Sequence, residues 1–324
     1  MVDSGVTRRG FLGAAAAGAA AAHLAGCEPA ANEPKPKGGE PLNVRYGLNL
    51  LVYTAAFTKD KIDLIPKVAD MGFDGVEIPY NDLSLLDTAA TKAALQKAKM
   101  GMTACCVMMP GTNPCSPDAD ERKKGIARLK QMVDLTAEMG GEAIAGPLYS
   151  PCGHLTGKGP TEEELKWCAE ALAAGAAHGE KAGIPLAIEP LNRFETYVIN
   201  TVDQALDMVK RVGSDYLTVQ VDTFHANIEE KDTGEAIRKV GKKHLGHFHA
   251  SESDRGTPGT GQVAWDASFA ALRDLGYDKW VTIESFAIGI LDLCAAASIW
   301  RPIYESADGL ATQGLAFLKQ QAGA

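Results

Sequence analysis

Basic residues are scarce relative to acidic residues in this chain. Its 324 residues include 32 Lys and Arg against 41 Asp and Glu, which gives a formal net charge of −9 at pH 7. Proteins that bind nucleic acid neutralise phosphates with clustered Lys and Arg, so this balance argues against DNA or RNA as a partner. Hydrophobic residues make up 46% of the chain, which is ample for a large core and excludes an intrinsically disordered protein.

The chain also lacks a long, strongly apolar run. Its most apolar stretch, residues 11–26, consists mostly of Ala and Gly and is shorter than the ~20 apolar residues that a membrane-spanning helix needs. The twin arginines Arg8 and Arg9 precede this stretch, and the combination resembles a Tat export signal.

The same stretch ends in Leu-Ala-Gly before Cys27, which is similar to a bacterial lipobox, whose Cys is lipidated and becomes the new N-terminus. We therefore expect a Tat-type lipoprotein signal peptide over residues 1–26, and a mature protein that is periplasmic or held at the membrane by a lipid on Cys27. The alternative is an Ala-rich leader that is cut elsewhere and leaves Cys27 unmodified.

Motifs for disulfide scaffolds and for phosphate-binding loops are missing as well. Six cysteines follow Cys27, without a C-x-x-C pair, and the chain is longer than disulfide-dependent scaffolds, so we expect most of them to be buried as small apolar residues. The first expected strand has no G-x-G-x-x-G after it, and the chain contains no G-x-x-x-x-G-K-[ST]. The chain therefore lacks the glycine-rich loops that bind phosphate in dinucleotide-binding and P-loop folds, and we do not expect either fold.

Residues 27–43 differ in composition from the remainder of the mature chain. Between residues 28 and 43 there are four prolines, two glycines and several charges, a composition that cannot bury a core and indicates a tether. No second linker of this kind interrupts residues 44–324, so we expect them to form one domain. That length is normal for an α/β barrel.

Short apolar runs alternate with amphipathic helical stretches along this domain. The runs that we expect to form strands are 45–52, 75–79, 103–109, 143–149, 185–190, 217–222, 245–250 and 280–285. Their spacing leaves room for a helix after each strand, which predicts a parallel sheet. Eight such units predict an α/β fold of the (β/α)8 TIM-barrel type, with an open doubly wound sheet as the alternative.

Ionisable residues lie at the carboxyl ends of the last four of these strands. They are Glu189 in the fifth, Asp222 in the sixth, His249 in the seventh and Glu284 in the eighth. Because barrel enzymes build their sites at the carboxyl ends of strands, we expect these four side chains to converge. Three crowded carboxylates repel one another unless a cation lies among them, and this ligand set suits Mn²⁺, Mg²⁺ or Co²⁺ better than a structural zinc site. Among these cations we expect Mn²⁺ first.

Three further histidines lie near this end of the strands. His225, three residues beyond Asp222, is expected to reach the same mouth, although a histidine bonded to the loop backbone is the alternative. His247 alternates with His249 along one strand, so both face the same way. Only one of them need bind the metal, and we expect the other to support that ligand. His154 is expected to lie in a loop.

Several motifs together resemble a known family. They are Ile188-Glu-Pro-Leu-Asn-Arg-Phe-Glu195, Val221-Asp-Thr-Phe-His225, Leu245-Gly-His-Phe-His249, Glu252-Ser-Asp-Arg255 and Ile283-Glu-Ser-Phe286. They are similar to motifs of ketose 3-epimerases of the D-psicose (D-allulose) and D-tagatose type, within the xylose-isomerase-like sugar phosphate isomerase/epimerase superfamily.

The resemblance implies a metal-dependent enzyme that transfers a proton at C3 of a ketose through a cis-enediolate. Position by position, it places the metal ligands at Glu189, Asp222, His249 and Glu284, with Glu189 and Glu284 also as the catalytic acid and base. It places sugar contacts at Glu195, His225 and Arg255, and leaves a homodimer or homotetramer open.

Two segments depart from the family pattern. Where the family has an aromatic pair after the fourth strand, this chain has Tyr149-Ser-Pro-Cys152, and the end of the first strand reads Leu50-Leu-Val-Tyr-Thr54. We therefore expect the reacting centre of the family inside different pocket walls. Aldose–ketose and hydroxypyruvate-type isomerases of the same superfamily remain alternatives, as does a non-catalytic exported lipoprotein that binds sugar.

Overall fold

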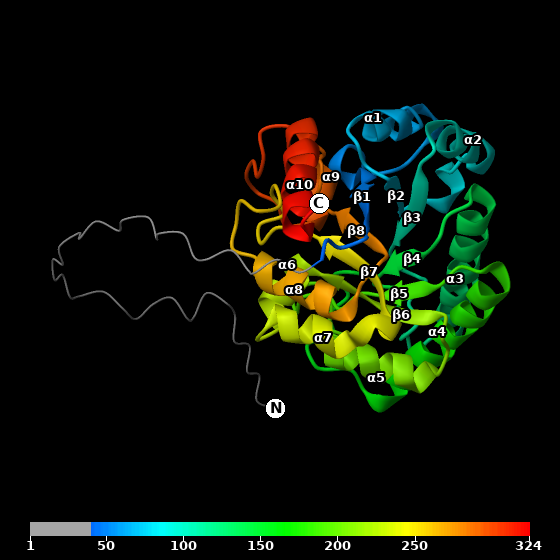
Figure 1. Cartoon of the computed structure of the whole chain (residues 1–324). Helices are drawn as coiled ribbons and strands as arrows, with labels where there is room; N and C mark the ends of the chain where they lie inside the picture. Colours follow the sequence, from blue (N-terminus) through cyan, green and yellow to red (C-terminus); the bar gives the residue numbers. More distant parts are fainter. Residues whose placement is uncertain (1–39) are drawn as a thin grey trace, which may run out of the picture. The chain divides into compact units, whose positions relative to one another are not determined.

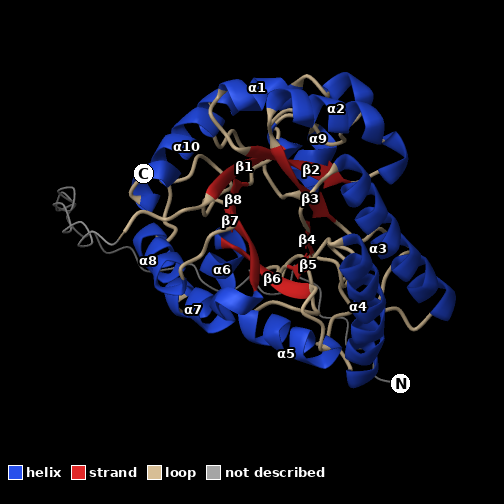
Figure 2. Cartoon of the chain, turned by 45° about the vertical axis from the view of Figure 1, so that its right-hand side comes forward, coloured by secondary structure: helices blue, strands red, loops and turns tan. Residues whose placement is uncertain are grey.

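Eight parallel strands form a closed ring in chain order, with helices around the outside (Figures 1 and 2). The structure, a computed structural model, describes residues 40–324. The expected signal peptide, Cys27 and most of the tether lie outside the described residues. The strands are β1 (Arg45–Asn49), β2 (Gly75–Tyr80), β3 (Gly101–Cys106), β4 (Ile144–Gly146), β5 (Leu186–Ile188), β6 (Leu217–Asp222), β7 (Leu245–Ala250) and β8 (Trp280–Ile283). The prediction of a TIM barrel is confirmed.

Helices connect the strands and cover the outside of the barrel. The α-helices are α1 (Leu64–Asp70), α2 (Thr88–Ala98), α3 (Ala119–Met139), α4 (Glu162–Ala182), α5 (Val202–Val212), α6 (Thr223–Glu229), α7 (Thr233–His244), α8 (Trp265–Leu275), α9 (Leu291–Ala296) and α10 (Ala307–Ala322). Short 3-10 turns are η2 (Leu50–Val52), η3 (Lys59–Lys61) and η4 (Leu83–Leu85). Among the described residues, no helix is long and apolar enough to span a membrane.

The barrel closes where its first strand meets its last. Arg45 of β1 lies opposite Trp280 of β8, and Leu48 lies opposite Ile283. Most strand residues are buried, since the barrel interior lies on one side and the helices on the other. This double burial explains why the strands appear in the sequence as apolar runs without alternation.

Two expected strands end earlier than their apolar runs. The run at 45–52 leaves the sheet at Asn49 and turns into η2, whose first residues are capped by the Asn49 side chain. The run at 103–109 belongs to the sheet only up to Cys106, although β3 begins two residues earlier, at Gly101. Hydrophobicity continues past both strand ends because residues there line a cavity at the mouth of the barrel.

Paired capping residues fix the beginnings of two helices next to the site. Thr161 and Glu164 form a capping box that starts α4, and Thr201 and Gln204 form another that starts α5. In each box the hydroxyl and the longer side chain satisfy backbone N–H groups that have no partner within the helix. These helices hold the loops that follow β4 and β5.

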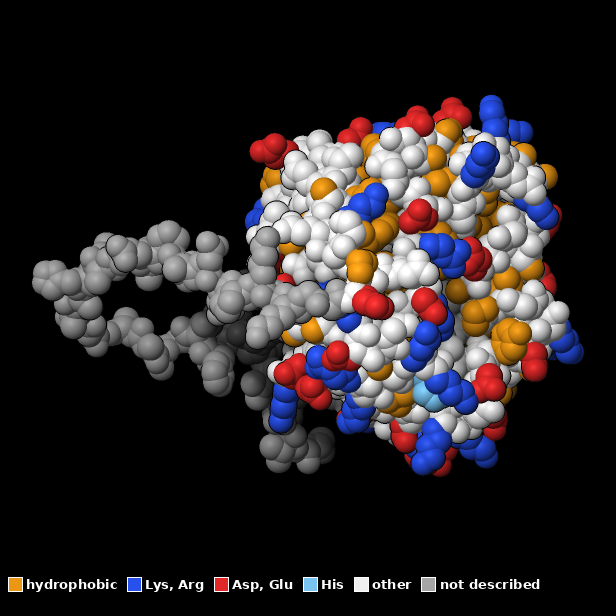
Figure 3. Space-filling view, in the orientation of Figure 1, with side chains coloured by type: hydrophobic (Ala, Val, Ile, Leu, Met, Phe, Trp, Pro, Cys, Tyr) orange, Lys and Arg blue, Asp and Glu red, His pale blue; other side chains and the backbone are white. Residues whose placement is uncertain are grey.

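Charges of both signs are interspersed on the face shown in Figure 3.

Four of the cysteines beyond residue 40 are buried, at 105, 106, 115 and 168, whereas Cys152 is exposed. All six described cysteines are free thiols, which agrees with the expectation that most of them serve as small buried residues.

Candidate functional site

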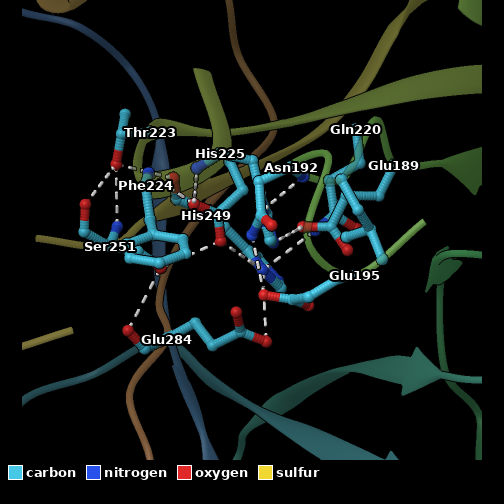
Figure 4. A network of polar contacts seen from close by, with 12 residues as sticks. Glu189, Asn192, Glu195, Gln220, Thr223, Phe224, His225, His249, Ser251 and Glu284 are labelled. Carbon is cyan, nitrogen blue, oxygen red and sulfur yellow. Dashed lines mark hydrogen bonds and ion pairs between the residues drawn. The ribbon is translucent and has the colours of Figure 1, made fainter. Parts of the chain in front are cut away.

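Four ionisable side chains converge at the carboxyl ends of the last four strands. One ligand atom of each of Glu189, Asp222, His249 and Glu284 lies within 4.8 Å of those of the other three, and all four residues are buried. The structure therefore brings together the four residues expected from the strand ends. Figure 4 shows three of them and the polar network around them.

Neighbouring strands and helices hold these carboxylates in place. The backbone N–H of Glu189 donates to the carbonyl of Gly146 on β4, 3.1 Å away. Asp222 caps the N-terminus of α6: its Oδ1 accepts from the N–H groups of Phe224 and His225, at 2.6 and 3.4 Å. Because Oδ1 is used in this way, Oδ2 is the oxygen that faces the site, where Ser251 donates to it at 2.9 Å.

A buried carboxylate that the sequence patterns did not reveal orients His249. Oε1 of Glu77, inside β2, lies 2.6 Å from Nε2 of His249, and its Oε2 lies 2.7 Å from Nε2 of His247. Nδ1 of His249 therefore faces the carboxylates, 3.6 Å from Asp222 Oδ2 and 3.5 Å from Glu284 Oε1. This geometry places His247 behind His249, in the supporting position that was predicted for one histidine of the pair.

Two amides complete the surroundings of this histidine. The Nδ2 group of Asn49, at the end of β1, lies 3.0 Å from Glu77 Oε1 and 3.1 Å from Glu284 Oε1, so it bridges the two carboxylates. The amide nitrogen of Gln220 lies 2.9 Å from Nδ1 of His249 (Figure 4). A charged residue in the otherwise apolar run at 75–79 was the one signal in the sequence that could have identified Glu77.

The electrostatics of the cluster match a site for a cation. Burial, together with the charges of Glu284 and Asp222, raises the pKa of Glu189 well above its ordinary value. Burial also acts to raise the pKa of Asp222, but Arg255 and His249 outweigh it and hold that pKa well below its ordinary value. Oε1 of Glu189 is buried without a hydrogen-bond partner. A divalent cation such as Mn²⁺ or Mg²⁺ fits this set of three carboxylates and one imidazole nitrogen, and it would give the unpartnered oxygen of Glu189 a ligand.

Arg255 reaches into this cluster from the loop after β7. Its Nη1 donates to Asp222 Oδ2 and to Glu284 Oε2, both at 2.9 Å, and its guanidinium carbon lies 3.9 Å from the centroid of the Phe224 ring. The backbone of Arg255 is left-handed, with φ of 64°. Buried Glu252 stabilises this loop by accepting four hydrogen bonds, from the backbone of Ser253, Gly259 and Val263 and from the indole of Trp265.

His225 and Glu195 border the same space. Nδ1 of His225 accepts from the backbone N–H of Asn192 at 3.0 Å, and Nε2 lies 3.0 Å from Nη2 of Arg255, a group that can only donate. Burial and the nearby Arg255 guanidinium lower the pKa of His225 to about 4, which keeps the ring neutral near pH 7. The side chain of Asn192 donates to Glu195 Oε1 at 2.7 Å. The three residues expected to contact sugar, Glu195, His225 and Arg255, line the same cavity.

This reaction cavity has a volume of about 270 Å³. Its polar lining includes Glu189, Glu195, His225, Arg255 and Glu284. Aliphatic and sulfur-containing side chains form another part of the lining: Leu51, Val107, Met108, Met109, Cys152, Leu191 and Leu293. The two segments that depart from the family pattern contribute Leu51 and Cys152 to this lining.

Tyr149 and His154, in the loop after β4, lie apart from this lining. Tyr149 is buried, and its hydroxyl donates to the backbone carbonyl of Glu189 at 2.8 Å, which holds the strand end from behind. The ring of His154 packs edge-on against Tyr197, 6.0 Å between centroids. His154 is a loop residue, as expected.

The fold and the site together define a barrel enzyme with a candidate cation site at its cavity. Residues 65–321 match the family model described as xylose isomerase-like TIM barrel. An L-ribulose 3-epimerase of Mesorhizobium japonicum is 33% identical over 278 residues, which cover 85% of this chain and 93% of that protein. A D-psicose 3-epimerase of Ruminiclostridium cellulolyticum is 32% identical over 276 residues, covering 82% and 92%.

Solved structures agree with this assignment. The crystal structure of a D-allulose 3-epimerase of Methylomonas sp. in complex with D-allulose has a TM-score of 0.82 and 29% identity, and covers 87% of this chain and 98% of that one. The chain therefore belongs to the xylose isomerase-like TIM barrel family, and its relatives there include ketose 3-epimerases. It is an enzyme of the isomerase class.

Proposed function

We propose that this protein is a metal-dependent ketose 3-epimerase. The observation that carries the proposal is the buried cluster of Glu189, Asp222, His249 and Glu284, in which two glutamates from opposite parts of the ring meet at one cavity. Relatives named as 3-epimerases of L-ribulose and D-psicose support the same reaction for this chain. All four residues would hold the divalent cation, Mn²⁺ being the best match to the ligand set.

Epimerisation moves a proton between the two faces of C3. The proton on this carbon, next to the C2 carbonyl, is weakly acidic, and a bound cation would supply the positive charge that stabilises negative charge developing on the substrate oxygens. One of Glu189 and Glu284 removes the proton from one face, which leaves a cis-enediolate, and the other returns a proton to the opposite face. The direction of reaction decides which glutamate acts as the base.

Three other residues position the sugar. His225 lines the cavity and would contact the C2 oxygen, while Glu195 would accept hydrogen bonds from hydroxyls. Arg255 is already bonded to Asp222 and Glu284. The remaining charges on the cavity are carboxylates that repel a phosphate, so we propose a free sugar rather than a sugar phosphate as the substrate.

Exchange of the C3 proton with solvent tests the reaction directly. With Mn²⁺ in D₂O, the purified protein is expected to incorporate deuterium at C3 of a ketose such as D-fructose, D-psicose or L-ribulose, as followed by NMR. Glu284→Gln is expected to lower the exchange rate by at least about 10³-fold, because it removes one acid–base group and one metal ligand. Unfolding followed by circular dichroism checks that the variant keeps its fold.

Product analysis distinguishes the alternatives. Deuterium at C3 with a 3-epimeric ketose as the product supports the proposal. Accumulation of an aldose would identify an aldose–ketose isomerase instead, and sugar binding without any exchange would identify a binding protein. Exchange that is unchanged in Glu284→Gln would contradict the role given to that residue.

We also propose that the enzyme works outside the cytoplasm. The twin arginines before the Ala-rich run and the Leu-Ala-Gly-Cys27 motif support export and lipidation. Replacing both Arg8 and Arg9 by Lys is expected to keep the full-length protein in the cytoplasmic fraction, whereas Cys27→Ala is expected to allow export but release the protein from membranes. Fractionation followed by immunoblotting measures both effects, and export of the double Lys variant at the wild-type level would contradict the signal assignment.

A further inference from the structure

A second cavity opens directly beside the reaction cavity. This outer groove has a volume of about 480 Å³ and lies between the loop after β5, helix α6 and the segment that joins α9 to α10. Three residues, Glu195, Arg255 and Ala297, line both the groove and the reaction cavity. A ligand bound at the reacting centre can therefore continue past Glu195 into the groove without crossing the protein core.

Two exposed aromatic side chains line the groove. Phe194 is 71% exposed and Trp300 is 77% exposed, whereas Trp265 and Trp280 elsewhere in the barrel are 6% and 4% exposed. Leaving large aromatic surfaces in water loses the free energy that burying them would provide, so two of them in one groove indicate a surface that a ligand covers. They come from segments about a hundred residues apart in the chain.

Hydrogen bonds and an ion pair within the protein hold the loop that carries Phe194. Asn192 accepts the Phe194 backbone N–H at 2.9 Å, donates its own N–H to His225 at 3.0 Å and holds Glu195 through its amide at 2.7 Å. Arg193 pairs with Glu229 of α6 at 2.9 Å. One rigid turn thus places Glu195 on the reaction cavity and Phe194 in the adjoining groove, which lowers the entropy lost on binding.

Polar groups border the same aromatic surface. Asp254 and Arg301 line the groove and pair with each other at 2.9 Å, and both side chains stay partly exposed. Sugars present C–H faces that pack on aromatic rings and a rim of hydroxyls that bond to carboxylates and guanidinium groups. The groove therefore offers both kinds of contact that a sugar ring makes.

We infer that the outer groove binds a second sugar unit, so that the preferred substrate is a ketose carrying a glycosyl substituent rather than a free monosaccharide. This inference rests on the proposed epimerisation at C3 for the position of the ketose. The substituent extends from the ketose past Glu195 and packs on Phe194 and Trp300. The volume of the groove exceeds that of the reaction cavity, which is sufficient for one further ring.

Matched substrates test this directly. D-Fructose bearing a glucosyl group at O4 or at O6 keeps C2, C3 and their oxygens free for the reaction, and unsubstituted D-fructose is the reference. Wild-type enzyme with Mn²⁺ is expected to show a higher kcat/KM for C3 deuterium exchange with at least one glucosylated ketose than with D-fructose. Trp300→Ala and Phe194→Ala are each expected to lower that ratio about tenfold, mainly through KM.

Trp167→Ala is the matched control. Trp167 stacks with Arg122 at 4.5 Å and lines a separate surface cavity of about 500 Å³ beside α4. This variant is expected to keep the wild-type ratio. A ratio that stays the same in Trp300→Ala and Phe194→Ala, or a wild-type enzyme that neither binds nor exchanges the glucosylated ketoses, overturns the inference.

Two further measurements separate the remaining explanations. Calorimetry measures binding of the same sugars and so tests the groove separately from the reaction. Suppose that no sugar exchanges its C3 proton, but the glucosylated ketose binds more tightly than D-fructose and Trp300→Ala removes that preference. This outcome supports the groove and contradicts the proposed epimerisation. Sedimentation velocity detects a second copy of the chain on this surface. A dimer that Trp300→Ala dissociates, with no change in the substrate ratio, also overturns the inference.

Discussion

Glu77 illustrates how much of the site lies behind the residues that would touch a metal. Its two carboxylate oxygens lie 2.6 and 2.7 Å from the histidines of β7, and Thr103 donates to it at 2.9 Å. Groups of this kind fix which nitrogen of a ligating histidine is available and how its ring is oriented. The position of His249 in β7 therefore depends on Glu77 in β2, which lies on the other side of the seam between β8 and β1.

Replacing Glu77 by Gln is expected to weaken Mn²⁺ binding about 10- to 100-fold, because an amide presents a donor to one of the two histidines where the carboxylate presents an acceptor. Titration of the apoprotein with Mn²⁺ in competition with a chelator measures the change. Glu142→Gln, which removes a charge at the exposed ion pair with Arg45, is the control and is expected to leave the affinity unchanged. Equal affinities for both variants would contradict the role of Glu77.

Single residues were predictable from the sequence where position in the fold determines them. Glu189, Asp222, His249 and Glu284 could be found because strand ends in a barrel share one mouth. Asn49 could not, since the apolar run around it continues to residue 52 and concealed the end of β1. Neither could the structural role of Glu252, whose hydrogen bonds join residues of one loop and follow no sequence period.

At the scale of elements, strand boundaries were the least predictable feature. A strand buried on both faces has no alternation to mark its ends. In the run at 103–109, Val107, Met108 and Met109 are apolar because they line the reaction cavity, whereas the residues before them are apolar because they lie in the barrel wall. Composition alone does not distinguish these two reasons, but it does give the number and order of the strands.

The end of β4 allows a direct test of how an element supports the site. Gly146 has φ of 129°, and a Cβ there would lie 2.2 Å from the carbonyl oxygen of Cys106. Gly146→Ala is therefore expected to reduce the free energy of unfolding by more than about 3 kcal/mol and to lower the exchange rate, because Gly146 also accepts the Glu189 N–H. Urea unfolding and the exchange assay measure the two effects.

Gly140→Ala separates backbone strain from the steric clash. Gly140 ends α3 with φ of 80°, and a Cβ there would meet nothing within 4 Å. This control is expected to lose only about 1 kcal/mol of stability and to keep its activity. A loss in Gly146→Ala no larger than that of the control would show that β4 adjusts to the added carbon.

For the whole molecule, metal binding and folding are expected to be coupled. Three carboxylates are buried at one point, and their repulsion in the absence of a cation opposes folding. Free Mn²⁺ at 100 times its Kd is expected to stabilise the protein by about 2.7 kcal/mol and to raise Tm by several degrees. EDTA should reverse the rise, and Glu284→Gln should reduce it; a Tm that is the same with Mn²⁺ and with EDTA would contradict the coupling.

The seam between the first and last strands also sets an order of events during synthesis of the chain. Asn49 is made early, whereas its partner Glu284 comes 235 positions later, and the two meet only when β8 pairs with β1. A ribosome must therefore release nearly the whole polypeptide before the cluster can assemble. Nascent or truncated chains that end before residue 284 lack a complete site, so neither cation capture nor proton transfer can begin until translation of the barrel is finished.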